Sequence, residues 1–475
     1  MSVLLGSSGA SVILGSSGGG VVLSTAGETK SVIQSSDFTY LGAFRLPESF
    51  QWQGAGFAHR YVDGDLRFFS VNNGAELVEF DAPASLASGV TTAPIAAVNR
   101  NWGSLYTTLP GGWSKWGIHW DSTDARLYWT IGSNYESDPD TSFLGCSVLD
   151  DGAGTLTKYG KWKLTGRGQK MALGGMVNIP SDFATAYTSG RRLGLGFGGY
   201  HSLTNVGPAS LGPALCAVDP PSLSLADADT LPAFTELVGY PSGVGDRVKR
   251  FTTDIINYFD SAASNRVTWN CSILQSGVWI DTPTKHGVLF GMCMDHMAIN
   301  TTVAASPTPT TTSATLTNAG DLAAGDVVWM EASGQPSHGY VAVTIATISG
   351  DNITFAVQEA APDVGGWCRA GGFYAFSTLW WSRGSHYWYV YDPADLASVA
   401  TGAVTQDAIQ PLNGWSVEYP HISYPIPGGN GFGPKPVTAM TYDATTQRLY
   451  VMWNNAWTPD GWLEACAGVH VYQVS

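Results

Sequence analysis

Short polar turns followed by dense apolar runs recur along the whole chain. The clearest copies begin at Asp63, Asp121 and Asp443, and weaker copies begin at Ser189 and Lys285. A turn rich in Asp, Ser, Thr or Gly that leads into aliphatic and aromatic residues is typical of a β-hairpin. Five copies of one hairpin indicate a repeat architecture, in which each unit buries its apolar face against its neighbours.

Each hairpin is followed by a further apolar run. Three of these runs end at an Asp with a Pro close behind, and two lack the Pro; the runs are residues 77–83, 215–220, 387–393, 146–150 and 469–472. Proline ends a strand because it cannot donate a hydrogen bond to the ladder. The pattern therefore predicts an all-β fold, a five-bladed β-propeller with blades near residues 53–83, 113–151, 172–219, 278–395 and 437–475.

The two ends of the chain are expected to complete this ring. Residues 40–45 form an apolar strand that can pair with the C-terminal strand, which would close the last blade and remove its exposed edge. Residues 231–277 leave an alternative open, because residues 234–237 and 267–270 resemble two short strands of a sixth blade.

Three domains are predicted. Residues 37–300 and 373–475 form the propeller, and residues 301–372 form a small inserted β domain that begins with the stiff linker 306–309. Residues 1–36 repeat apolar triplets at Val3, Val12, Val21 and Val32 between Gly/Ser turns. Such triplets are too short to fold alone, so this arm is either a β segment for docking and oligomerisation or a flexible tail.

Composition limits the classes of partner. The 475 residues carry a net charge of −15 and no Lys/Arg run, so we expect no nucleic-acid binding. No apolar stretch approaches the length of a membrane span, and the N-terminus lacks the features of a secretion signal. The six cysteines show no C-x-x-C spacing; Cys146, Cys216 and Cys466 are expected in the core, and Cys293 and Cys368 are the one candidate pair.

One end of the ring gathers the candidate ligand-binding residues. We call this end the rim: there the second strand of each blade connects to the third, and each blade connects to the next. Aromatic, amide, imidazole and carboxylate residues on these connections suit sugar recognition, with the turn-forming role of Asn and Gly as the alternative. The candidates are Trp52, Trp113, Trp116, Asn134, Tyr135, Tyr200, His201, Asp295, His296, Asn454, Asn455 and Trp457.

Motifs for catalysis are weak. Glycoside hydrolysis needs two carboxylates about 5–9.5 Å apart, and no spacing singles out a pair among Glu136, Asp138, Asp246, Asp254 and Asp295. His119, His201, His296 and His421 lie on separate units without metal-binding spacing. We therefore expect no catalytic residues, no metal and no cofactor, and the balance favours a protein that is not an enzyme.

Two parts of the sequence carry a resemblance. Residues 315–326 and 345–355 of the inserted segment resemble small β modules of tailed-phage virion proteins and adhesins. Residues 38–47 and the propeller body resemble β-propeller proteins of phage and environmental bacteria. This resemblance transfers no functional residues.

These observations predict a virion structural protein of a tailed phage, of the tail or surface appendage type, assembled in the host cytoplasm. Residues 1–36 would contact other virion proteins or form a homo-oligomer, and the rim would contact a host-surface glycan or protein. The alternatives are a propeller glycan hydrolase that acts through rim carboxylates, and a decoration protein without a ligand.

Overall fold

The computed structural model describes most of the chain after residue 29. The described residues are 30–47, 55–72, 75–89, 92–105, 113–133, 142–164, 174–200, 213–227, 229–231, 233–239, 266–267, 273–296, 298–299, 301–305, 313–316, 324–325, 327–332, 340–355, 376–381, 383–417, 437–457 and 466–475. Within them, no helix is long and apolar enough to cross a membrane.

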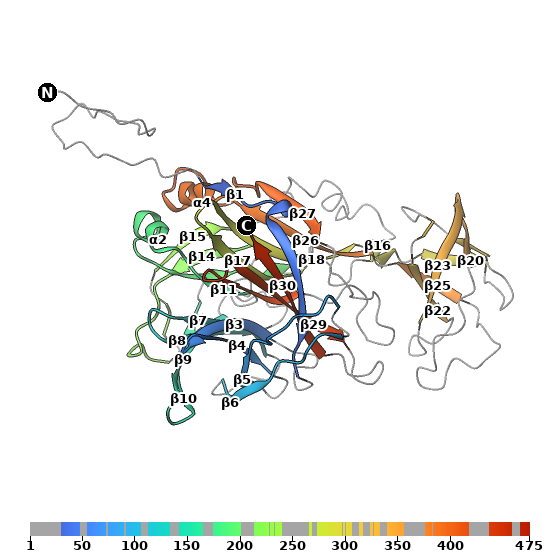
Figure 1. The fold of residues 1–475 in the computed structure, drawn as a ribbon. Helices are drawn as coiled ribbons and strands as arrows, with labels where there is room; N and C mark the ends of the chain where they lie inside the picture. The colour runs from blue at the N-terminus through green and yellow to red at the C-terminus, as the bar shows by residue number, and fades with distance from the viewer. Residues whose placement is uncertain are drawn as a thin grey trace, which may run out of the picture.

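Five antiparallel sheets form the blades of a β-propeller (Figure 1). Blade 1 contains β3 (Ala55–Val62), β4 (Asp65–Val71), β5 (Glu76–Asp81) and β6 (Val98–Ser104), and blade 2 contains β7 (Trp113–Asp121), β8 (Arg126–Ser133), β9 (Ser142–Asp150) and β10 (Thr155–Lys163). Blade 3 contains β11 (Met176–Asn178), β12 (Leu193–Gly196), β14 (Leu215–Val218) and β15 (Phe234–Val238). Blade 4 contains β17 (Ile273–Asp281), β18 (Lys285–His296), β26 (Arg383–Tyr391) and β27 (Asn413–Val417), and blade 5 contains β28 (Val437–Asp443), β29 (Arg448–Trp457), β30 (Cys466–Val474) and β2 (Phe38–Arg45).

Short elements join these sheets. The helices are η1 (Ser35–Asp37), α2 (Ser181–Tyr187) between β11 and β12, and α4 (Pro393–Ala400) between β26 and β27. The remaining short strands are β1 (Ser31–Val32), β13 (Gly199–Tyr200), β16 (Arg266–Val267) and β19 (Ala298–Ile299). Asp392 caps α4 by accepting a hydrogen bond from the Ala394 amide, with Pro393 in the first turn, so the Asp-Pro pair ends a strand and starts a helix.

The ring is closed by the two ends of the chain, as predicted. The outermost strand of blade 5 is β2, and it pairs antiparallel with β30 from Phe38 opposite Val474 to Arg45 opposite Gly468. The Ser475 amide donates to the Asp37 carbonyl at 3.0 Å. Pairing of distant segments within one blade leaves no open seam in the ring.

The alternative of a sixth blade is wrong for the described residues. Residues 234–237 belong to β15, which is the outermost strand of blade 3, and β16 pairs with β19 rather than with a new blade. The helical spacing at residues 253–259 lies outside the described residues. Blades 1 to 4 also extend one strand beyond the blade bounds expected from the sequence, because β6, β10, β15 and β27 follow the third strand.

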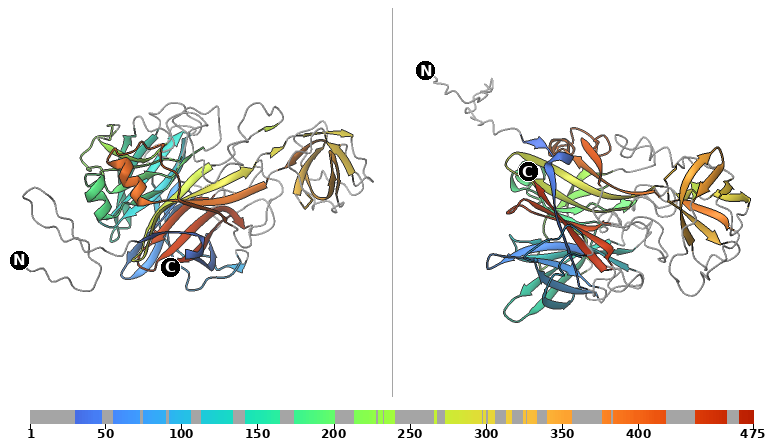
Figure 2. Two further views of the ribbon diagram at one scale, coloured as in Figure 1. Left: turned by 90° about the horizontal axis from the view of Figure 1, so that it is seen from above. Right: turned by 45° about the vertical axis from the view of Figure 1, so that its right-hand side comes forward.

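A closed barrel of six strands interrupts blade 4 between β18 and β26. Figures 1 and 2 show it as a separate lobe beyond the ends of these two strands. Its strands are β20 (Thr301–Ala305), β21 (Ser313–Leu316), β22 (Val327–Ala332), β23 (Tyr340–Ser349), β24 (Asn352–Phe355) and β25 (Phe376–Trp381). The sixth strand, β25, therefore lies beyond residue 372.

The propeller has two different ends. At the end that we call the hairpin face lie the turns between first and second strands, such as residues 63–64 and 444–447, together with Asp37 and Ser475. At the opposite end, the rim, β18 runs out toward the barrel and β26 returns from it. The polarity of the ring thus separates the chain termini of the propeller from the inserted barrel.

Close packing at the ring centre depends on glycine. A Cβ atom on Gly56 of β3 would lie 2.6 Å from the Ile118 amide nitrogen of β7, and Gly56 has a φ of +73°. Both the space and the backbone conformation require a residue without a side chain. The innermost strands of blades 1 and 2 can therefore approach each other closely.

Candidate functional site

The topology places the described rim candidates at one end of the ring. Trp113 and Trp116 lie on β7 near its start, opposite the end of β8. Asp295 and His296 end β18 and pair with Gly384 and Arg383 of β26. In an antiparallel blade, the start of the first strand lies beside the end of the second strand. These four residues therefore lie at the same end of the ring, the rim.

The other described candidates occupy equivalent positions. Asn454, Asn455 and Trp457 lie at the end of β29, where Trp457 pairs with Cys466. Tyr200 ends β13 and pairs with Ile273 at the start of β17. Trp52, Asn134, Tyr135 and His201 lie outside the described residues, as do Glu136, Asp138, Asp246 and Asp254. The structure therefore gives the positions of the described candidates along their strands, and their role in ligand binding remains a prediction.

Carboxylates at the hairpin face are used by their own turns. Asp443 is 1 % exposed and accepts hydrogen bonds from the Thr445 amide at 3.0 Å and the Tyr61 hydroxyl at 2.7 Å, as well as from the Thr446 hydroxyl. Burial alone would raise the pKa of Asp443, but these hydrogen bonds and nearby His59 lower it on balance. A carboxylate that is held ionised and fully hydrogen-bonded stabilises a turn and is a poor general acid.

The same use of aspartate occurs in blade 2. Asp121 is fully buried, accepts from the Thr123 amide at 2.9 Å and forms an ion pair with Arg192. Arg192 also contacts Asp124 at 2.9 Å. The turn between β7 and β8 is thereby tied to blade 3, which supplies Arg192.

Two imidazoles lie on innermost strands near the ring centre. His59 Nδ1 is 2.8 Å from the Thr441 hydroxyl, which joins β3 to β28 of blade 5. Burial lowers the pKa of His59 to about 4, against the opposing effect of Asp443 and with a further lowering by His119. His119 of β7 is likewise kept neutral by burial, which lowers its pKa although Asn178 hydrogen-bonds to it.

His119 and His59 lie on the neighbouring innermost strands β7 and β3, and His119 contributes to the lowered pKa of His59. Within the described part of the chain, no three His, Cys, Asp or Glu residues are arranged to hold a metal ion. His201 and His421 lie outside the described residues.

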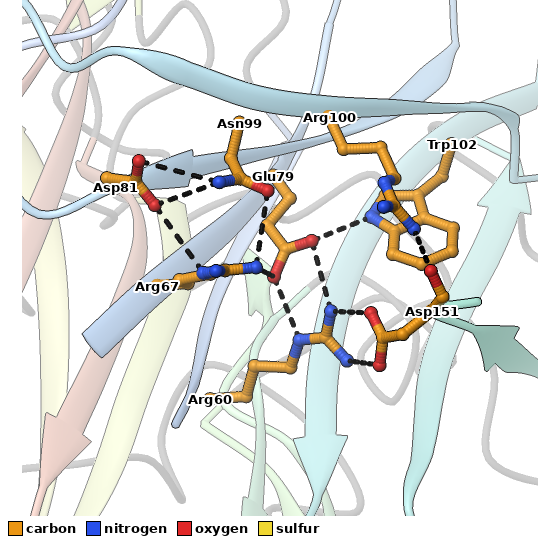
Figure 3. Close-up of polar contacts among 8 residues, drawn as sticks. All are labelled: Arg60, Arg67, Glu79, Asp81, Asn99, Arg100, Trp102 and Asp151. Atoms are coloured by element: carbon orange, nitrogen blue, oxygen red, sulfur yellow. Dashed lines mark hydrogen bonds and ion pairs between the residues drawn. The ribbon is translucent and has the colours of Figure 1, made fainter. Parts of the chain in front are cut away.

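A cluster of charged residues joins blade 1 to blade 2 (Figure 3). The Arg60 guanidinium donates to both oxygens of Glu79 at 2.9 and 3.1 Å and to both oxygens of Asp151 at 3.0 and 2.6 Å. Trp102 Nε1 donates to Glu79 at 3.0 Å. The rings of Phe69, Trp102 and Trp120 lie about the Arg60 guanidinium at 5.2, 5.6 and 5.2 Å.

The periphery of this cluster is also paired, as Figure 3 shows. Arg67 lies 3.5 Å from Asp81, Asn99 donates to Asp81 at 3.3 Å, and Arg100 donates to the Asp151 carbonyl at 2.8 Å. The hydrogen bond from Arg60 lowers the pKa of Asp151. Because Glu79 is buried and every charge has a counter-charge, the cluster is a structural clasp between blades and offers no free acid or base.

The sequence analysis missed this clasp and the His59 contact. Glu79 is 19 positions from Arg60, but Asp151 is 91 positions away. Only the presence of Arg60 on β3 and of Glu79 on β5, each within an apolar strand of blade 1, offered a signal, since an arginine and a glutamate within apolar runs need partners. Cys146 and Cys216 are buried, as expected; Cys368 lies outside the described residues.

Comparisons with known proteins add little. No family model matches the chain, and no curated protein matches it. A solved structure of a GH43 endo-arabinanase from Bacillus licheniformis is similar, with 10% sequence identity and a TM-score of 0.29 over 68% of this chain and 99% of that chain. A likeness at this level says nothing about activity, and the five-bladed arrangement rests on the strand pairing itself. None of the comparisons supports the resemblance to phage proteins, which stays a prediction.

Proposed function

We propose that the protein is a surface-binding platform of a tailed-phage virion whose rim contacts a host glycan. The observation that carries this proposal is the polarity of the ring. The N-terminal segment joins the propeller at the hairpin face, through β1 and Asp37, whereas the barrel departs from the rim. A protein that is held at one end and binds at the other needs this arrangement.

The residue types at the rim support a glycan as the ligand. Trp113, Trp457 and Tyr200 supply flat faces for C–H stacking, and Asn454 and Asp295 supply donors and acceptors for hydroxyl groups. Several weak sugar-binding contacts around one ring can bind neighbouring units of the same polysaccharide at once, and this raises the overall affinity for a repeating polymer. The barrel extends from the same end and adds a further surface there.

Attachment through residues 1–36 is supported by how this segment meets the propeller. Ile33 is fully buried, and the Asn413 side chain donates to its carbonyl at 2.7 Å. Lys30 pairs with Asp281, and Lys285 contacts Asp37 at 3.0 Å. A force or a partner acting on the arm would therefore be transmitted to blades 4 and 5, which is what an attachment point requires.

Binding without cleavage is the form of the proposal, and hydrolysis is its alternative. The buried described carboxylates, Asp37, Glu79, Asp121 and Asp443, are each held by hydrogen bonds or ion pairs, so none of these four is available as a general acid. The rim carboxylates Glu136, Asp138, Asp246 and Asp254 lie outside the described residues. The hydrolase and the decoration protein without a ligand remain outcomes of the same experiment.

The test is incubation of the purified protein with a panel of bacterial envelope polysaccharides, with bound protein and new reducing ends scored in the same samples. We expect binding without new ends, weakened about tenfold or more by Trp113→Ala or Trp457→Ala. Tyr187→Ala is the matched control, because Tyr187 is an exposed aromatic residue on α2 at the hairpin face. New reducing ends would establish the hydrolase, and absence of binding to every polymer would leave the decoration protein.

A further inference from the structure

The inserted barrel carries a regular array of polar side chains on three neighbouring strands. These strands pair in the order β21, β24, β23. Each contains two polar residues separated by one small or aliphatic residue. The triplets are Ser313-Ala314-Thr315 in β21, Asn352-Ile353-Thr354 in β24 and Thr347-Ile348-Ser349 in β23. Because successive side chains of a strand point to opposite faces, the two polar residues of each triplet share one face.

The strand register aligns these polar residues in two rows. The first row is Ser313, Thr354 and Thr347, and the second is Thr315, Asn352 and Ser349. Neighbouring strands lie about 4.8 Å apart, and alternate residues of one strand are about 6.6 Å apart. We call these six residues the hydroxyl face of the barrel.

The hydroxyl face is open to solvent. Ser313, Thr347, Ser349 and Asn352 are exposed, and Thr315 and Thr354 are partly exposed. By contrast, the Ile353 side chain, which lies between two of these residues on β24, is 0 % exposed. The alternation along β24 therefore separates an apolar barrel interior from a polar outer surface.

Hydrogen bonds within each row hold the polar groups in place. The Thr315 hydroxyl donates to Asn352 Oδ1 at 2.7 Å, and the Thr347 and Thr354 hydroxyls share a hydrogen bond. An asparagine also carries two N–H donors, and a hydroxyl that donates keeps its acceptor lone pairs. Side chains that are already ordered lose less conformational freedom when a ligand binds. The rows are thus arranged before any ligand arrives.

The chemistry of the hydroxyl face selects one class of ligand. All six side chains are uncharged, and every one can both donate and accept a hydrogen bond. A nucleic acid or an anionic lipid surface would require lysine or arginine, and the centre of a protein interface is rich in aromatic residues and arginine. A neutral polymer with many hydroxyl groups requires neither.

We infer that the hydroxyl face binds a neutral polysaccharide through hydrogen bonds from both rows. Hydroxyl groups recur along such a polymer, so successive sugar units can contact successive strands of the face at once. The face belongs to the barrel, which Figure 2 shows as a lobe apart from the blades. It is therefore a second surface, and the inference does not require that the rim binds a glycan.

Affinity electrophoresis of the full-length chain in gels that contain dextran, mannan or the anionic polymer hyaluronan tests this inference. We expect a neutral polymer to retard the protein, and Thr347→Val/Thr354→Val to weaken binding about tenfold, because it removes two hydroxyls and keeps the β-branched shape. Thr155→Val/Thr157→Val is the matched control. These exposed threonines of β10 lie opposite Asp150 and Val148 rather than other hydroxyls, so binding should be unchanged.

Several results would overturn the inference. They are unchanged binding in the Thr347/Thr354 variant, equal weakening in the control, no retardation by dextran or mannan, and equal retardation by hyaluronan. Self-association that disappears in the Thr347/Thr354 variant, measured by sedimentation velocity, would assign the face to a second copy of the chain.

Trp113→Ala separates this surface from the rim. Loss of binding in the Thr347/Thr354 variant but not in Trp113→Ala would support the hydroxyl face and contradict the rim site. The opposite result would support the rim site and overturn the inference.

Discussion

The junction between blades 1 and 2 and the junction between blades 4 and 5 are built from different interactions. The first contains the Arg60, Glu79 and Asp151 clasp within a layer of aromatic rings. The second contains an aliphatic and aromatic core, in which Trp388 lies 5.3 Å from Phe38 and 5.4 Å from Tyr472 between ring centres. A buried ion pair depends on every partner, whereas apolar contacts are non-directional.

The two junctions also differ in the segments that form them. The clasp residues Arg60, Glu79 and Asp151 all come from the continuous stretch of chain that forms blades 1 and 2. Blades 4 and 5 are joined with the help of β1 and β2, which come from the other end of the chain. Apolar contacts do not require exact placement of donors and acceptors when these distant segments pack together. The register of β1 on β18 and of β2 on β30 then fixes their positions.

The largest effect is expected from breaking the clasp. Arg60→Ala would remove the two-point ion pair of the buried Glu79 carboxylate and leave only Arg67, at 3.9 Å, as its counter-charge, which costs about 3–5 kcal/mol in the free energy of unfolding. Denaturant unfolding measures this change. Arg60→Met/Glu79→Leu is the control, because it removes both charges and should cost much less; equal losses in the two variants would mean that packing rather than charge holds the junction.

A smaller effect is expected at the other junction. Ile33→Ala removes an aliphatic group that is fully buried between blades 4 and 5 and should cost about 2–4 kcal/mol. Val32→Ala is the comparison, since Val32 is only partly buried. If the two variants unfold at the same denaturant concentration, the triplet is not anchored by Ile33.

The smallest change in stability is expected on lowering the pH, which affects polar contacts such as that of His59 and leaves the apolar junction of blades 4 and 5 unaffected. The folded-state pKa of His59 is about 4, below its ordinary value of 6.5. The unfolded chain therefore takes up a proton first, and the contribution of His59 is full above about pH 6.5 and falls as the pH drops toward 4. His59→Gln should flatten the stability profile over this window, and an unchanged slope would contradict the assignment.

The architecture was predictable where residue pattern and burial agree. The turns at Asp121 and Asp443 precede strands whose apolar residues are buried, and these gave five blades and the closing strand. The outermost strands β6 and β10 were missed because their side chains are largely polar or partly exposed, as in β6, where Trp102 is the one buried residue. Edge strands bury little surface, so their sequences carry little apolar signal.

The site was less predictable for a different reason. Thr441, the partner of His59, and Asp151, one partner of Arg60, are 382 and 91 positions away in the sequence, and no local pattern indicates such pairs. Strand ends can be located from turns, which is why the rim could be assembled from sequence. Which side chains at the rim act together depends on loop conformation, and turn chemistry alone does not determine it.

Closure of the ring also sets a time order for folding during synthesis. Asp37 and Ser475 are in contact although 438 positions separate them. At about 5–20 residues per second, a ribosome needs roughly 20–90 s to make the chain between them. During that interval β2 has no strand to pair with, so the nascent chain carries an exposed edge that chaperones or neighbouring nascent chains can bind.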